Sequence, residues 1–152
     1  MSASFIEDLR SAASAVALDI DIFNAGTHRD IDAAFRSPVQ KRSDAVLVAP
    51  DPMFIDRHVQ LVTAATYHRV PTIYFSREFV ESGGLMSYGT NHPDVYRQVG
   101  IYVGRILKGE KPADLPIVRA TKFEFVINLQ TARTLGFEVP ANLLALADEV
   151  IE

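Results

Sequence analysis

Residues 83–94 read GGLMSYGTNHPD, and this stretch decides the fold because it joins a predicted strand directly to a long helix. The segment 85–88 is short and apolar and follows two glycines, which is typical of a strand between two layers. Residues 90–91 offer a Thr or Asn cap, and Pro93 lies where a first-turn N–H has no partner anyway. Open α/β sheets bind ligands where a strand turns into a helix N-terminus. We therefore expect the functional site around residues 88–91.

The helix that follows is predicted from about Val95 to Leu107. Apolar residues recur on one of its faces, as expected for a helix: Val95, Val99, Tyr102, Val103, Ile106 and Leu107. Gly109 and Pro112 then stop it. Gly100 and Gly104 lie four residues apart, which permits close approach of another backbone but also fits ordinary packing.

Length and composition indicate one soluble globular domain. The 152 residues are predicted to form a single α/β domain over 1–152, long enough to bury a sizeable core. The net charge is −4 and Lys and Arg are scattered singly, which argues against nucleic-acid binding. The absence of cysteine excludes disulfides, thiolate catalysis and cysteine-ligated metal. An amphipathic helix at 4–17 stands where an export signal would be, and no apolar run is long enough for a membrane span.

Helix and strand patterns alternate along the whole chain. Predicted helices cover 4–17, 27–38, 52–68, 95–107, 129–135 and 140–150, with a helical turn within 76–82. Predicted strands cover 18–23, 45–48, 70–75, 85–88 and 122–127. The run 45–48 is continuously apolar, which indicates a strand covered on both faces. The pattern therefore predicts an α/β fold, a three-layer α/β/α sandwich with a mainly parallel sheet.

Several motifs carry a resemblance to a known family. They are GGLMSYG (83–89), ILKG (106–109), KPADLP (111–116), TKFE (121–124), VIN (126–128) and ADEVI (147–151), with REF (77–79) fitting too. In this order they resemble the carboxyl-terminal half of the ABC-transporter substrate-binding protein family. The resemblance covers nearly the whole chain.

The resemblance implies a fold and a function. Members have two periplasmic-binding-protein-like α/β lobes that close over a ligand, and better-known relatives bind aromatic amino acids. The chain would then be one ligand-binding lobe, non-enzymatic, for a small amino-acid-like solute that an ABC permease accepts in the periplasm. Residues 83–118 resemble the segment that crosses to the other lobe. The family's export signal and first lobe are not in this sequence, so a chain expressed as written is expected in the cytoplasm.

Within the family geometry, candidate ligand contacts lie on the loops after strands. Asp51 can pair with an amino group or simply cap the next helix. Ser76, Arg77 and Glu78 can bind carboxylate and ammonium groups, or form a solvated rim. Tyr88 can stack on an aromatic ligand, donate from its hydroxyl, or belong to the core.

Three rival chemistries fit the sequence less well. Ser87 lies in a near-match to a serine-hydrolase elbow, but Leu85 replaces its first glycine and His92 follows too closely. Asp51 after an apolar strand resembles the phosphoacceptor of a response-regulator receiver, which requires a strand rather than a helix at the start. The four histidines show no metal-ligand spacing: His28, His58, His68 and His92. We expect no cofactor, no metal site and no catalytic turnover.

The alternative is a stand-alone cytoplasmic interaction or sensor domain derived from such a receptor. The lobe's first, central strand would precede this chain, which leaves 18–23 to pair with a neighbour or to form an open edge. The apolar face of the helix at 95–107 would also lack its partner lobe. These features predict a homodimer with residues 93–108 in the interface.

Overall fold

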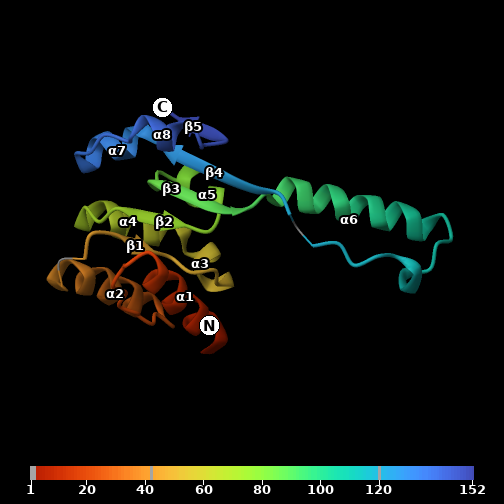
Figure 1. Cartoon of the computed structure of the whole chain (residues 1–152), viewed down its shortest axis with the longest axis horizontal. Helices are drawn as coiled ribbons and strands as arrows, with labels where there is room; N and C mark the ends of the chain where they lie inside the picture. The colour runs from red at the N-terminus through yellow and green to blue at the C-terminus, as the bar shows by residue number, and fades with distance from the viewer. Residues whose placement is uncertain (1–2, 42, 120) are drawn as a thin grey trace.

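The computed structural model describes residues 3–41, 43–119 and 121–152, and its centre is one five-stranded sheet (Figure 1). Its strands lie in the order in which they occur along the chain: β1 (Val46–Leu47), β2 (Thr72–Tyr74), β3 (Met86–Thr90), β4 (Phe123–Asn128) and β5 (Glu149–Ile151). β1, β2 and β3 are parallel, and so are β4 and β5. Only the β3–β4 pairing is antiparallel, so the sheet is mainly parallel, as predicted.

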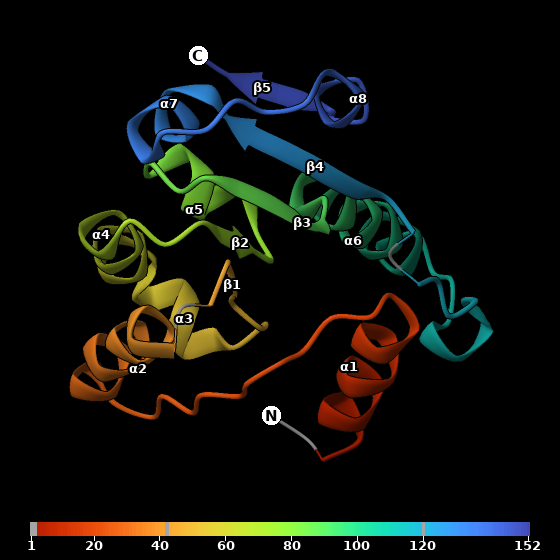
Figure 2. The ribbon, with the colours of Figure 1, turned by 60° about the vertical axis from the view of Figure 1, so that its left-hand side comes forward.

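Helices flank this sheet. They are α1 (Ala3–Ala15), α2 (His28–Lys41), α3 (Pro52–Asp56), α4 (His58–His68), α5 (Arg77–Glu81), α6 (His92–Leu107), α7 (Leu129–Leu135) and α8 (Ala141–Leu144), with a 3₁₀ turn at Pro112–Asp114. In Figure 2, α2 and α4 lie beside β1 and β2, and α7 and α8 lie beside β4 and β5. The predicted α/β class with a mainly parallel sheet is confirmed.

Two apolar clusters form the core. The larger lies between the sheet and helices α2, α4 and α5, where the fully buried Phe79 ring stacks on Tyr74 with centroids 4.7 Å apart. The smaller joins Leu85 and Ile127 of the sheet region to Ala132 of α7. Both clusters lie under helices that connect neighbouring strands, so the core fixes where the strand ends lie.

The strand predicted at 18–23 is wrong. Residues 18–26 carry no regular secondary structure, although apolar and acidic residues alternate there. A period of two produces a strand only where a neighbouring backbone exchanges hydrogen bonds with it, and no strand of the described chain lies beside this segment. Side chains hold it instead: Lys41 pairs with Asp21 at 3.0 Å and lies over the Phe23 ring.

The helix predicted over 140–150 is also wrong. α8 ends at Leu144, and β5 follows as a parallel partner of β4. Asp148 accepts a hydrogen bond from the Phe125 backbone N–H at 2.8 Å, which aligns the chain for this pairing. Ladder hydrogen bonds to β4 therefore override the helical spacing of the leucines.

Two helix boundaries also differ from the prediction. The predicted helix 52–68 breaks at Arg57, whose φ of −112° and ψ of 19° are not helical, into α3 and α4. α2 continues past Pro38 to Lys41, although proline was expected to end or kink it. The remaining strands and α7, capped by Asn128 and closed by Gly136, lie where the sequence predicts them, although β1 and β2 are shorter.

The long helix α6 projects away from the sheet, and the chain returns beside it before entering β4 (Figure 1). None of its residues is buried, and Leu107 is 82% exposed. Tyr102 donates from its hydroxyl to the Pro116 carbonyl at 2.7 Å, which ties the returning segment to the helix. The apolar face of α6 thus has no cover within the described chain.

Gly89 allows β3 to approach the loop after β2. A Cβ atom at Gly89 would lie 1.8 Å from the Phe75 carbonyl oxygen, so the backbone of the loop after β2 would have to shift. We expect Gly89→Ala to lower the free energy of unfolding by at least ~3 kcal/mol in urea denaturation. The matched control is Gly100→Ala, whose Cβ meets nothing within 4 Å and should not destabilise the protein. Equal stability of the two variants would contradict this close approach.

Candidate functional site

The candidate site lies along one edge of the sheet. Because β4 is antiparallel to β3, the carboxyl ends of β1, β2 and β3 share this edge with the amino ends of β4 and β5. The loops that follow β1, β2 and β3 therefore meet the residues that precede β4 and β5. Gly89, within β3, allows that strand to approach the loop after β2 at this edge. This is the edge at which mainly parallel sheets bind ligands.

Ser76, Glu78 and His92 form a hydrogen-bonded chain at this edge. Ser76 is 3% exposed and donates from its hydroxyl to the Glu78 carboxylate. The other carboxylate oxygen lies 3.3 Å from His92 Nδ1. His92 is the first residue of α6, so this chain joins the start of α5 to the start of α6.

Glu78 is ionised at neutral pH. Partial burial opposes its ionisation, but hydrogen bonds from Ser76, from its own backbone N–H and from His92 outweigh that effect. They hold the pKa of the carboxyl below its ordinary value of 4.5. The Glu78 side chain remains 43% exposed, so a charged acceptor faces solvent at this edge.

Arg77 lies next to this chain but is engaged by protein groups. It donates to Glu81 at 2.8 Å, to Glu124 at 3.1 Å and to Glu149 at 2.9 Å. Hydrogen bonds to Glu81 and Glu149 raise the pKa of Arg77 above its ordinary value. The guanidinium therefore joins α5 to β4 and β5.

Glu124 and Asn91 belong to the same network. Asn91 lies within the range 88–91 predicted to hold the site, whereas Glu124 was not predicted as a site residue. Glu124 is only 7% exposed and accepts from Arg77 and from Asn91 Nδ2, the latter at 2.9 Å. Asn91 Oδ1 also caps α6 by accepting from the Asp94 N–H at 2.9 Å. The Asn91 cap was visible in the sequence. For Glu124, the only signal in the sequence was a charged residue within a predicted strand.

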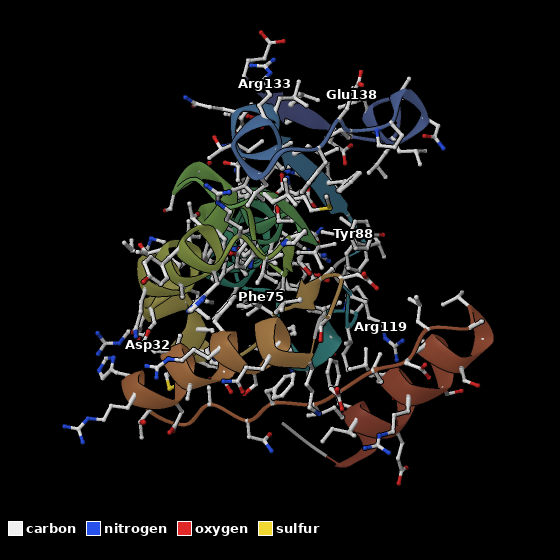
Figure 3. All side chains as sticks on the ribbon, turned by 90° about the vertical axis from the view of Figure 1, so that its left-hand side faces the viewer. Asp32, Phe75, Tyr88, Arg119, Arg133 and Glu138 are labelled. Carbon is white, nitrogen blue, oxygen red and sulfur yellow. The ribbon has the colours of Figure 1, made fainter. Side chains whose placement is uncertain are left out.

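Tyr88 lies on the opposite face of the sheet from Glu124. Its ring is 57% exposed and stacks on Phe123, with centroids 5.7 Å apart and an interplanar angle of 11° (Figure 3). Phe125 meets Tyr88 edge-on at 6.5 Å. Tyr88 is thus an exposed aromatic surface rather than a core residue, and Phe123 is a neighbour that sequence reasoning missed.

The structure separates the five predicted site residues into three places. Ser76, Arg77 and Glu78 lie together at the start of α5, whereas Tyr88 lies on the other face of the sheet at the same edge. Asp51 caps α3, accepting from the Met53 N–H at 2.9 Å. The capping interpretation of Asp51 is confirmed, and a ligand contact for it stays a prediction.

Other features bear on the rival chemistries. Ser87 is 1% exposed and its hydroxyl has no hydrogen-bond partner, so a substrate cannot reach it as a hydrolase elbow requires. Within the described ranges, no three histidine or acidic side chains gather in a way that could hold a metal ion. None of the helices described is long and apolar enough to cross a membrane.

Comparisons with known proteins identify a family. The sequence matches the family model described as ABC transporter substrate binding protein over residues 1–151. None of the curated proteins compared with it matches.

Three solved structures share the fold. A conserved domain protein from Vibrio cholerae O1 biovar El Tor has a TM-score of 0.84 and 26% identity, over 97% of this chain and 49% of its own. The ABC domain from Streptococcus pneumonia, in complex with L-Trp, has the same TM-score and identity, over 97% and 51%. A ligand-free, open substrate-binding protein with adhesive properties from Clostridium difficile has a TM-score of 0.67 and 23% identity, over 96% and 48%. The chain spans about half the length of each.

The Arg77 network should stabilise the fold. Arg77→Ala would leave the buried Glu124 carboxylate without its cation, and we expect it to lower the free energy of unfolding by about 3 kcal/mol. Arg97→Ala, which removes an exposed pair with Asp94, should leave stability unchanged and serves as the control. Urea denaturation of both variants measures the difference. A stable Arg77→Ala protein would show that the network contributes little.

Proposed function

Because this chain belongs to the family of ABC transporter substrate-binding proteins, we propose that it is one ligand-binding lobe of a receptor for a small amino-acid-like solute. The observation that carries the proposal is the composition of one sheet edge. An exposed aromatic stack, Tyr88 on Phe123, lies at the edge where an ionised Glu78 is held by hydrogen bonds. An amino acid with an aromatic side chain offers a matching group to each.

The solute class is also supported by a related structure. The Streptococcus domain, 26% identical to this chain, is in complex with L-Trp. A ring of that kind can stack on an exposed tyrosine, and its ammonium group can meet a carboxylate. We infer an aromatic amino acid as the first solute to test.

A single lobe encloses only part of a ligand. Small-molecule sites usually bury most of the ligand surface, and this chain covers about half of its relatives. We propose that the complete receptor binds its solute outside the cytoplasmic membrane and passes it to an ABC permease. The protein binds its solute without changing it chemically, as expected of a member of a substrate-binding protein family.

The uncovered helix α6 favours the alternative of a stand-alone interaction or sensor domain. Its exposed apolar side chains include Val99, Val103 and Ile106, which are 53%, 49% and 39% exposed. Contiguous exposed apolar groups of this kind mark protein interfaces. We propose that two copies of the chain cover each other along residues 93–108, and this homodimer is compatible with either function.

We expect the chain to bind L-Trp weakly and in fast exchange, because the second half of the contact is missing. Tyr88→Ala should weaken binding roughly three- to tenfold, as loss of an aromatic contact does. Tyr67→Ala is the matched control, since Tyr67 is a tyrosine that is 82% exposed on α4 and does not belong to the candidate site. NMR titration against aromatic and aliphatic amino acids measures both. Binding that is indifferent to Tyr88→Ala would exclude the aromatic stack as the site.

We expect a dimer at micromolar concentration by size exclusion with light scattering. Val103→Glu should convert it to a monomer, because it places a charge on the apolar face of α6. Val59→Glu is the control, since Val59 is 59% exposed on α4. A folded monomer in the unmodified chain would refute the dimer, and a dimer indifferent to Val103→Glu would refute this interface.

A further inference from the structure

Arg77 and Glu78 are adjacent in sequence, but the protein uses their hydrogen-bonding capacity differently. An amino-acid-like solute presents one ammonium group and one carboxylate group. Arg77 is the side chain that would suit the carboxylate, and Glu78 is the one that would suit the ammonium. Their existing contacts decide which end of the solute this lobe can bind.

Arg77 already satisfies carboxylates of the protein itself. Three of its five N–H donors are engaged, one each by Glu81, Glu124 and Glu149. These contacts hold the planar guanidinium group from three directions. The group therefore cannot turn to form a bidentate contact with another carboxylate without breaking one of its present hydrogen bonds. A solute carboxylate would also meet the negative charge that surrounds this single cation.

Glu78 keeps free acceptor capacity. A carboxylate offers about four lone-pair positions. The Ser76 hydroxyl uses one, the Glu78 backbone N–H uses another, and His92 Nδ1 lies at hydrogen-bonding distance from a third. The remaining position is on a side chain that is 43% exposed at this edge of the sheet. Ser76 is buried and His92 begins a long helix, so both hold the carboxylate in one orientation.

The charge balance within this network also favours a cation. Glu81, Glu124 and Glu149 contact one permanent cation, Arg77, and Glu78 contacts one histidine, His92. Such an excess of negative charge attracts an ammonium group and repels a carboxylate.

We propose that this lobe binds the ammonium end of its solute through Glu78, with Ser76 and His92 as positioning residues and Arg77 as a structural cation that does not contact the ligand. The inference rests on the proposed solute-binding function. It implies that the carboxylate end is bound outside this lobe. Glu78 thereby determines specificity for solutes that carry a primary amine.

Three ligands that share one ring separate the two ends of the solute. NMR titration of the unmodified chain with L-tryptophan, tryptamine and 3-indolepropionate compares the amino acid with its amine and its acid. We expect tryptamine to bind about as tightly as L-tryptophan, and 3-indolepropionate to bind at least tenfold more weakly. This comparison needs no variant, so it does not depend on how a substitution affects folding.

Variants then identify the residue. Glu78→Gln keeps the shape but removes the charge, and should weaken tryptamine binding about tenfold. Glu138→Gln is the control, since Glu138 is an exposed residue between α7 and α8 (Figure 3) and should change nothing. Arg77→Lys, which keeps the cation, should leave the preference for the amine unchanged.

Each outcome decides between the proposals. Binding of 3-indolepropionate but not tryptamine would overturn the ammonium assignment and leave solute binding intact. A Glu78→Gln protein that is folded by circular dichroism and binds tryptamine normally would overturn the role of Glu78. Failure of all three ligands to bind would overturn the proposed aromatic amino-acid function itself, and the inference with it.

Discussion

The buried carboxylate of Glu124 is the constraint on which this edge of the structure depends. A carboxylate that is 7% exposed needs a cation and hydrogen-bond donors, and Arg77 and Asn91 supply them from α5 and from the start of α6. Satisfying one charge therefore fixes the ends of β2, β3 and β4 relative to one another. The exposed groups of the candidate site, Glu78 on α5 and Tyr88 on β3, lie on elements next to this network.

The same edge divides its charged and aromatic side chains between the two faces of the sheet. Alternation along β4 places Glu124 on one face and Phe123 on the other, and the register opposite β3 brings Tyr88 beside Phe123.

Most of the fold could be predicted from the sequence because its elements are locally encoded. Caps at Asp51, Asn91 and Asn128 mark helix starts, and the apolar run at 45–48 marks the position of β1. The prediction that this strand is covered on both faces is wrong, because Leu47 is 55% exposed. The failures at 18–23 and 145–151 concern segments whose state depends on whether a strand lies beside them, which a local pattern does not contain. The contacts of Glu124 and His92 could not be predicted for a related reason, since their partners, Arg77 and Glu78, are distant in sequence.

The antiparallel step between β3 and β4 has an architectural consequence. These two strands are direct neighbours, and beyond their last pair the Asn91 N–H still bonds to the Lys122 carbonyl at 3.0 Å. Their geometry is that of a hairpin, in which α6 and its return segment occupy the place of a tight turn. The excursion is thus topologically separable from the sheet. Replacing α6 and its return segment with a short turn or with another module would change what the lobe is attached to without altering the strand order. Evolution or design can therefore modify this segment as an insert.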